Sequence, residues 1–440
     1  QANTVDTWTS NELQNSKKRK NKKLGDIVSY ISKEFNIPIS KGNLSLTRAK
    51  GEFKKLPKAV RLRIANDLPT ATHELGHLLD DEYDFTSSAN IDEIIEFAQR
   101  KSPTLMKQYK KNEVPDEAVA EFVREFVKDP QSTIKEVPKF SKEFIETLSP
   151  KDAQALKTLS EYSQQYYNSD FMDKVDAAMT SNKEIKKKNK PTASEISKEI
   201  YTKLVDSFAP IKEATDYVKE VKGTLSGKKD AYILAINSKN VDATMSTIFK
   251  EGMVDPNGNL TGGKGLIDCI KDISHKDIDL FDKYLVLKHS LEWIEPQEGA
   301  KLKRVFSDDT LQNSERIKRE IANLENNHPE FKEASENLYK FQQDMLKYWV
   351  VSMGGMDAIT YNKLQKMYPH YVPFMRDTGR NRTGFKSGFA NQQSPVKTAK
   401  GSGATIISPL ESIIKNVEKQ VKFGTRNRVM AVLGMYADNV

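Results

Sequence analysis

The segment HELGH at residues 73–77 constrains the local fold more than any other stretch of the chain. Residues four apart stand on the same face of an α-helix, so both histidines of the segment would face one side. Pro69 suits the first turn of such a helix. About opposite the histidines, helical spacing produces an apolar stripe of Ala71, Leu75, Leu78 and Leu79. The pattern predicts a helix over 69–82 with one packed face and one face that can hold a ligand.

The two histidines have the spacing of metal ligands on a helix. The imidazoles of His73 and His77 can both reach one ion, and Glu74 lies beside them, near the open coordination position of that ion. The chain has one cysteine, Cys269, which excludes an internal disulfide and a cysteine-rich zinc module. A bound metal would therefore have histidine and carboxylate ligands, and we expect Zn²⁺. The competing interpretation is a pair of solvent-facing histidines.

A third zinc ligand is expected on a second helix, over residues 115–128, because a catalytic zinc ion usually keeps three protein ligands. That helix would bury a stripe of Val119, Phe122, Val123, Phe126 and Val127. Glu117 and Glu121 are four residues apart on the opposite face. Carboxylates in such a place are ordinarily solvated, but with HExxH upstream one would bind the ion and the other would hydrogen-bond an imidazole and fix its tautomer. The pattern alone leaves open which carboxylate has which role.

Small residues on both helices allow close packing. Gly76 costs about 1 kcal/mol relative to alanine inside a helix, which indicates a close approach to its backbone unless the glycine is incidental. Ala118 and Ala120, beside the two glutamates of the second helix, would let a neighbouring helix come close.

These residues resemble a known family. HELGHLLDD followed by E-x-x-A-E-x-x-R, which runs from Glu117 to Arg124, is similar to the zinc metallopeptidases related to anthrax lethal factor, members of the wider gluzincin group. The resemblance is confined to residues 60–150. It implies that Glu117 is the third zinc ligand and that a tyrosine shortly before it stabilises the oxyanion. Tyr109 is one residue out of the family's register, and Tyr83 is the alternative for this role.

A second resemblance covers more of the chain. Residues 51–77, 366–377 and 409–429 look like segments of the very large multidomain proteins of bacteriophages and integrative elements. Such proteins often contain a metallopeptidase domain among helical modules and enter a new host with the DNA. The resemblance implies phage virion proteins as partners, and a location in the phage particle or the host bacterial cytoplasm. Because the sequence ends in an apolar helical pattern, we expect the chain to be a fragment of such a protein.

The order of residue types indicates four segments. We expect a basic tail over 1–23, a metallopeptidase-like domain over 24–165, a lysine-rich linker over 166–193, and a helical region over 194–440 that contains a long loop at 377–404. Glycine is sparse, at 21 of 440 residues, while lysine and glutamate are plentiful, a balance that favours helices. The expected fold is an α+β metallopeptidase domain followed by a mainly α-helical region, mostly α overall.

Within the metallopeptidase-like domain, a helix over 24–35 should precede a β-ribbon or small sheet, because alternating apolar and charged residues follow around Gly51 and Pro57. The helix that carries HELGH comes next. Further helices are expected over 90–110 and over 134–167, the latter with breaks near Pro138 and Pro150.

Charge and hydropathy restrict the partners. The net charge of +8 is the small difference between 69 basic and 61 acidic residues. The run KKRKNKK at 17–23 and the basic residues of 376–400 could contact nucleic acid, but we expect solvated segments and assign no nucleic-acid-binding residue. No apolar stretch approaches the roughly 18 residues of a spanning helix, so no membrane span is expected. The first residues lack the order of a signal peptide.

Together these patterns predict a zinc-dependent endopeptidase. Glu74 would be the general base that takes a proton from a water activated by the metal. The substrate would be a protein or peptide, which could pair as an added strand along the edge of the β-ribbon. The alternative is a structural or ejected phage virion protein in which the HExxH segment is vestigial and binds no metal.

Overall fold

The chain forms two compact units in a computed structural model. Unit 1 comprises Gln1–Met179, Arg304–Asn313 and Gly401–Thr405, and unit 2 comprises Thr180–Lys303, Ser314–Lys400 and Ile406–Val440. Both units are mostly helical and the only sheet among the described residues is small, which confirms the expected mostly α architecture with a minor β element. The structure describes residues 5, 8, 22–42, 50–55, 58–179, 209–222, 225–226, 229–237, 241–296, 302–377, 396 and 402–437.

Unit 1 is built around short helices that begin with proline. Six of them, from α3 to α9 with the exception of α4, carry proline in the first turn, where its missing N–H has no helical partner to lose. The helices of unit 1 are α2 (Leu24–Glu34), α3 (Leu68–Tyr83), η2 (Phe85–Ser87), α4 (Ile91–Lys101), α5 (Pro103–Met106), α6 (Val114–Lys128), α7 (Pro130–Glu136), α8 (Pro138–Thr147), α9 (Pro150–Tyr167), α10 (Phe171–Ala177) and η3 (Asp309–Gln312).

Most of the expected helices agree closely with these bounds, although α7 begins at Pro130 and not at residue 134. The expectation of a single helix over 90–110 is wrong, because α4 ends at Lys101 and α5 begins at Pro103. Ser102 between them lies outside the helical region, which the residue before a proline disfavours, with φ −134° and ψ 58°. The break matters for the site, since it brings the Ser102 side chain to α6.

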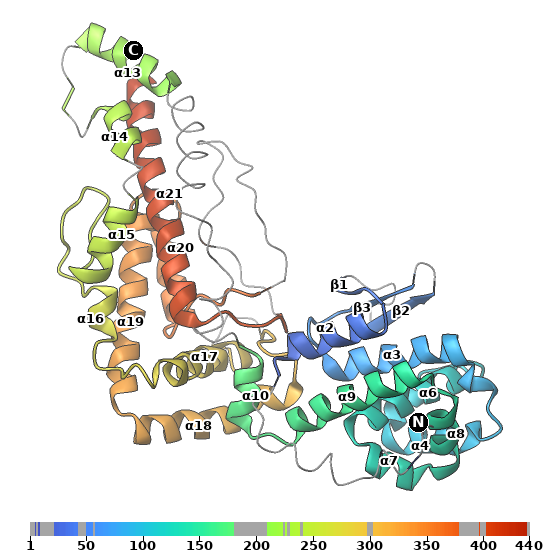
Figure 1. Cartoon of the computed structure of the whole chain (residues 1–440). Coiled ribbons are helices and arrows are strands. Elements are labelled where there is room, and N and C mark those ends of the chain that lie inside the picture. The colour runs from blue at the N-terminus through green and yellow to red at the C-terminus, as the bar shows by residue number, and fades with distance from the viewer. Residues whose placement is uncertain are drawn as a thin grey trace. The chain divides into compact units, whose positions relative to one another are not determined.

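The sheet of unit 1 has three strands, β1 (Ile39–Lys41), β2 (Gly51–Lys55) and β3 (Lys58–Leu62). The central strand β3 pairs in parallel with β1 and antiparallel with β2. The sheet lies along α2 and α3, as Figure 1 shows. The expected β-ribbon is therefore confirmed as the hairpin of β2 and β3. On its outer side β2 pairs with no described strand, so β2 is an edge.

The core of unit 1 surrounds α6. Phe122 and Phe126 of this helix pack against the rings of Phe140 and Phe144 from α8. Trp8 also joins this core, with its ring centroid 4.9 Å from that of Phe126 and only 2% of its surface exposed. Trp8 belongs to the expected tail over 1–23, most of which lies outside the described residues.

Helices α3 and α6 approach each other unusually closely. A Cβ atom added to Gly76 would lie 2.5 Å from Cα of Ala120 and 3.2 Å from Cβ of Val123, so only glycine fits at this crossing. The predicted close approach at Gly76 is confirmed. The expected apolar stripes of both helices are buried in the same core: Ala71, Leu75, Leu78, Leu79, Val119, Phe122, Val123, Phe126 and Val127.

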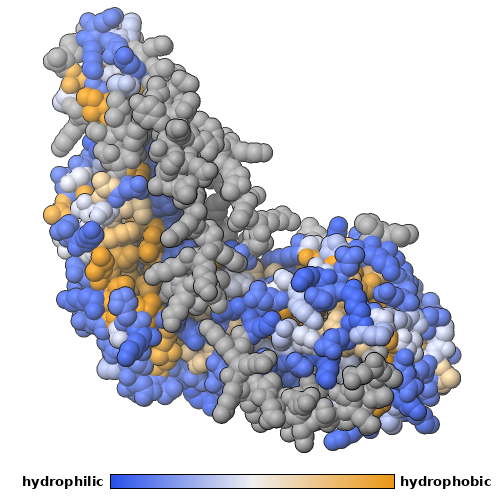
Figure 2. Space-filling view, in the orientation of Figure 1, coloured by the Kyte–Doolittle hydropathy of each residue, from blue (hydrophilic) through white to orange (hydrophobic). Residues whose placement is uncertain are grey.

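Unit 2 is a helical assembly dominated by two long helices, α19 and α21, which are in contact along part of their length (Figure 1). In the view of Figure 2, apolar side chains form a strip on the face of this unit, whereas the visible face of unit 1 is mainly hydrophilic. Its described helices are α13 (Ala209–Lys222), α14 (Ala231–Asn237), α15 (Val241–Lys250), α16 (Leu266–Cys269), α17 (Ile278–Ile294), α18 (Ser314–Asn327), α19 (Glu330–Leu346), η4 (Lys347–Val351), α20 (Ala358–Met367) and α21 (Pro409–Ala437).

Two expected segments fall largely outside the described residues. Of the linker over 166–193, residues 166–179 are described and contain the end of α9 and all of α10, while 180–193 are not. Of the loop over 377–404, only residues 377, 396 and 402–404 are described. No helix in the described part of the chain is both long enough and apolar enough to cross a membrane.

Candidate metal centre

Side chains of α3 and α6 converge on one point in unit 1. His73, His77 and Glu117 each offer one ligand atom, and these three atoms lie within 4.8 Å of one another. Nε2 of His73 is 3.2 Å from Oε2 of Glu117, and Nε2 of His77 is 3.7 Å from Oε1 of Glu117. Ligands at the usual zinc distances in a tetrahedron are about 3.3 Å apart. The spacing is therefore close to that of a zinc ligand set.

Local sequence explains why α3 presents its histidines here. The carboxylate of Asp67 caps the helix by accepting hydrogen bonds from the backbone N–H of Thr70 at 3.2 Å and from its hydroxyl at 2.8 Å. The following turns carry the apolar stripe into the core, which leaves the histidines on the side of α6. The close crossing of α3 and α6 then sets Glu117 against both imidazoles.

Glu121 holds His73 from the other side of the ring. Its Oε1 is 3.0 Å from Nδ1 of His73, while its Oε2 accepts from the Ser102 hydroxyl at 2.8 Å and lies 2.6 Å from Nη2 of Arg124. The side chain of Glu121 is completely buried. A hydrogen bond to this carboxylate requires a proton on Nδ1 of His73, so Nε2 is the nitrogen that would be free to bind a metal when the ring is neutral.

The two glutamates thus differ in ways that the sequence leaves open. Glu117 faces Nε2 of both histidines, and Glu121 faces only Nδ1 of His73. Burial opposes ionisation of both, but His73 and further positive neighbours outweigh it and lower both carboxyl pKa values. The geometry matches Glu117 as the ligand and Glu121 as the partner of an imidazole.

One oxygen of the cluster is poorly satisfied. Oε2 of Glu117 is buried and makes no hydrogen bond of good geometry with a described residue, although Nε2 of His73 lies 3.2 Å away. In the metal-free chain this contact is an ion pair with the protonated imidazole. A cation bound by the two Nε2 atoms would replace that proton as the partner of Oε2. Two imidazole nitrogens and one carboxylate oxygen are the donor set of many catalytic zinc sites, so the residues fit this metal.

Without a metal, the pKa values of the two histidines shift in opposite directions. Burial disfavours the charged form of His73, but the carboxylates of Glu117 and Glu121 outweigh burial and raise its pKa to about 9. Burial, reinforced by the positive charge of His73, lowers the pKa of His77 to about 4. At neutral pH the metal-free cluster therefore holds one charged and one neutral imidazole.

Glu74 is buried beside the cluster, with 5% of its surface exposed. Burial raises the pKa of its carboxyl group to about 7, with a further rise from Glu117 that His73 opposes. A group with this pKa can accept and release a proton near neutral pH, as a general acid–base catalyst requires.

The two candidate tyrosines occupy different places. Tyr109, in the turn between α5 and α6, has its hydroxyl near the Glu117 carboxylate, and burial together with that negative charge raises the pKa of the phenol. The hydroxyl of Tyr83 donates to the Asp152 carboxylate and accepts from the Ser149 N–H at 3.2 Å, at the start of α9. Tyr109 therefore belongs to the cluster, and Tyr83 is engaged in capping α9.

Ser102 and Gly51 contact the site, but sequence reasoning did not identify them. Ser102 bonds Glu121, and Gly51 packs against Glu74. Arg124 appears in the motif, but its contact with Glu121 was not anticipated. A serine before a proline marks a helix boundary, and a glycine in a strand often marks a close approach, but neither signal names the partner.

Other polar clusters do not share this geometry. His289 and His370 both contact Glu292 of α17, through Nδ1 atoms at 2.7 and 3.0 Å respectively. In the described part of the chain, His73, His77 and Glu117 form the one group of three such side chains with metal-ligand spacing.

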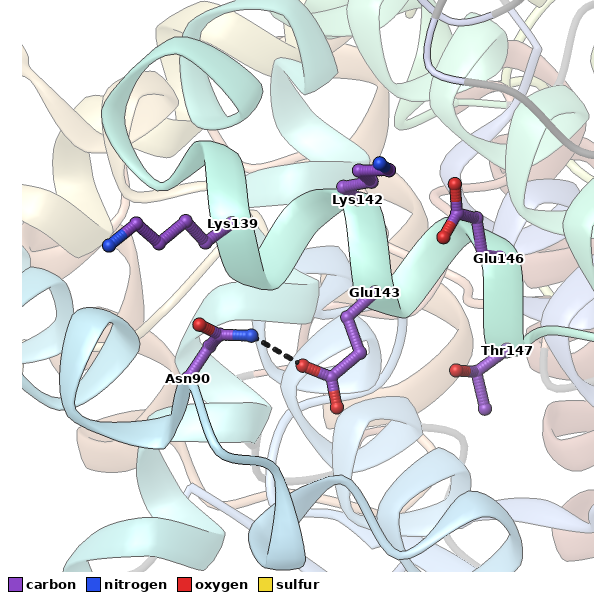
Figure 3. A pocket seen from close by; sticks show the side chains of 6 residues that line it. All are labelled: Asn90, Lys139, Lys142, Glu143, Glu146 and Thr147. Carbon is purple, nitrogen blue, oxygen red and sulfur yellow. Dashed lines mark hydrogen bonds between the residues drawn. The ribbon is translucent and has the colours of Figure 1, made fainter.

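A surface pocket of about 480 Å³ in unit 1 lies on α8 and the residue before α4 (Figure 3). In it Nδ2 of Asn90 donates to Oε2 of Glu143 at 2.8 Å. It contains no residue of the cluster on α3 and α6, so it is not the candidate site. The residues that line it are Asn90, Lys139, Lys142, Glu143, Glu146 and Thr147.

Comparisons of the chain with protein-family models, with curated proteins and with solved structures gave no match. The fold and the cluster thus define a mostly helical protein with a small sheet and one candidate two-histidine, one-glutamate metal centre. Its chemistry has to be argued from these residues.

Proposed function

We propose that the chain is a zinc-dependent endopeptidase whose site lies between α3 and α6. The observation that carries the proposal is the convergence of His73, His77 and Glu117, whose ligand atoms lie within 4.8 Å of one another. Glu74 next to this cluster supplies a proton-transfer group of suitable pKa. The combination of a three-ligand metal set and an adjacent general base is the arrangement that metal-assisted hydrolysis needs.

Glu74 moves the proton in the proposed reaction. Bound zinc would polarise the scissile carbonyl and lower the pKa of a water molecule to about 7. The Glu74 carboxylate accepts the proton of the attacking water as the new C–O bond forms. It then gives this proton to the leaving nitrogen as the C–N bond breaks.

Other residues hold the reacting groups in place. Glu121 keeps the proton of His73 on Nδ1, so that Nε2 presents a lone pair. We assign to the Tyr109 hydroxyl, which hydrogen-bonds Glu117 in the metal-free chain, the role of donating a hydrogen bond to the oxyanion. The high pKa of this phenol suits a donor that must stay protonated.

The edge strand β2 is the proposed docking element for an extended peptide. Its inner side pairs with β3, and on its outer side the N–H of Phe53 bonds Glu74, so an added strand would use the remaining outward backbone groups. Residues 51 and 53 of β2 both contact Glu74, so a peptide along this edge would pass the general base. The proposed substrate is therefore a protein or peptide in extended conformation.

We further propose, from the sequence segments that resemble phage and mobile-element proteins, that the chain acts within such a protein, in the phage particle or the host bacterial cytoplasm, with virion proteins as neighbours. Residues 366–377 and 409–429, two of those segments, belong to unit 2. Co-purification of the chain with intact phage particles would test this setting separately from the chemistry.

Zinc content and cleavage test the chemistry. Protein purified without chelators should hold about one zinc per chain, which His73→Ala should remove. Glu74→Gln should keep the zinc but cleave no member of a peptide library that the wild type cleaves. Fewer than about 0.3 zinc per chain, with no change on His73→Ala, would overturn the proposal in favour of a vestigial site.

A further inference from the structure

Gly51, the first residue of β2, lies directly against the Glu74 side chain. A Cβ atom added to Gly51 would be 2.4 Å from Oε1 and 2.9 Å from Cδ of Glu74, and 2.5 Å from Cγ2 of Thr70. These separations are far below ordinary van der Waals contact. The backbone of the edge strand therefore passes so close to α3 that no side chain fits between them.

The need for glycine here comes from space and not from backbone conformation. Gly51 is absent from the residues with positive φ, and it pairs with Leu62 in a regular antiparallel register. Any L-residue could adopt its backbone angles. The atoms that a Cβ would meet are the ends of two side chains, so a substitution would push those side chains and leave the helix backbone in place.

A second contact from the same strand fixes the carboxylate. The backbone N–H of Phe53 also donates a hydrogen bond to the Glu74 side chain. Gly51 thus limits the space available to the carboxylate, and Phe53 supplies its donor. Both residues belong to β2, so the position of Glu74 is set by the edge strand as well as by its own helix.

We propose that Gly51 is a positioning residue that seats the Glu74 carboxylate between edge strand β2 and the metal-centre helix. The packing role stands on the contacts alone, and its importance for hydrolysis rests on the proposed function. A methyl group at position 51 meets the side chains of Glu74 and Thr70 first, and so displaces the carboxylate. The base is then misplaced while the metal ligands keep their arrangement.

The packing role is tested through stability, which needs neither zinc nor substrate. In the full chain with chelator present, Gly51→Ala should lower the thermal midpoint by about 2–8 °C, as overpacking of a buried site does. Gly42→Ala is the matched control, since its nearest atom would be 3.9 Å away. The loss from Gly51→Ala should shrink in a Glu74→Ala background, where the overlapping carboxylate is gone.

Two results would overturn the packing role. One is an equal loss of stability from Gly51→Ala with and without Glu74→Ala. The other is a loss of stability from Gly51→Ala that persists in the Glu74→Ala background but disappears in a Thr70→Ser background, where Cγ2 of Thr70 is gone. Gly51 would then make room for Thr70 and not for Glu74.

The catalytic consequence has its own measurement. On a library peptide that the wild type cleaves, Gly51→Ala should lower kcat at least about tenfold while KM changes less than about threefold. Zinc affinity, measured by chelator competition, should stay within about threefold of wild type. An unchanged kcat would overturn the inference. A wild type without zinc or cleavage would instead defeat the proposed function, and the stability comparison would still decide whether Gly51 seats Glu74.

Discussion

Nδ1 of His73 lies 3.0 Å from Oε1 of Glu121, and the second oxygen of that carboxylate is held by Ser102 and Arg124. The glutamate is fully buried, and each of its oxygens has a partner from a different direction. A carboxylate anchored in this way can hold one ring orientation and one tautomer of His73. The contacts from Arg124 through Glu121 to His73 therefore extend the candidate metal centre into the packed interior of unit 1.

Glu121→Gln should weaken zinc binding about 10- to 100-fold, because an amide can satisfy His73 only by turning its NH₂ group toward Ser102 and Arg124. Chelator competition at neutral pH measures this change. Glu125→Gln is the matched control, since Glu125 also contacts Arg124, at 3.0 Å, but does not contact a histidine. Equal zinc affinities for the two variants would contradict a role of Glu121 in orienting His73.

The metal-free protein should lose stability as pH rises above neutral. The pKa of His73 is raised from 6.5 to about 9 in the folded state, so its contribution is complete below 6.5 and is lost as pH rises through 9. Between about pH 7.5 and pH 9.5 the free energy of unfolding should fall by about 2 kcal/mol. The pKa of Glu74 is raised to about 7, so its titration changes the free energy of unfolding mainly below this pH window. Urea denaturation in chelator measures the effect.

His73→Gln is the informative comparison for this pH dependence. The variant has no imidazolium to stabilise, so its unfolding free energy should be nearly constant over the same window. If the unfolding free energy of His73→Gln fell over this pH window as much as that of the wild type, the attribution to His73 would be wrong.

Gly76→Ala should destabilise the protein by about 2 kcal/mol or more, although alanine is the better helix former. Its Cβ would meet the backbone of Ala120 at 2.5 Å, so α3 and α6 would have to move apart. That movement would separate Glu117 from the histidines and weaken zinc binding as well. Gly434→Ala in α21, where a Cβ meets nothing within 4 Å, should be neutral or stabilising. Denaturation midpoints and zinc affinity distinguish the two variants.

Sequence periodicity was sufficient to place the two helices of the site, because Pro69 and Pro115 mark their starts and their apolar stripes are regular. It could not assign Glu117 and Glu121, since residues four apart on one face are equivalent until the neighbouring helix is placed. The crossing of Gly76 against Ala120 makes that choice. Helix spacing thus predicts which side chains share a face, and tertiary packing decides what each one meets.

The contacts that sequence could not supply come from outside those helices. Ser102 reaches Glu121 only because the chain breaks before Pro103, and Gly51 reaches Glu74 only because the sheet packs on α3. Trp8 is a similar case, since a single aromatic residue in a polar stretch has no periodic signal, yet it is buried against Phe126. Each of these contacts depends on long-range packing that short-range patterns do not encode.

The two tyrosines considered for oxyanion stabilisation should respond differently to loss of the hydroxyl group. Tyr109→Phe removes a donor beside Glu117 and should lower kcat about 10- to 1000-fold with zinc retained, as loss of an oxyanion donor does. Tyr83→Phe removes a hydroxyl that bonds Asp152 and Ser149, so it should cost about 1 kcal/mol of stability and leave kcat unchanged. Hydrolysis of a cleaved library peptide and urea denaturation of both variants make the comparison. A loss of kcat in Tyr83→Phe without one in Tyr109→Phe would reverse the assignment, because the catalytic hydroxyl would then have to come from the α9 cap.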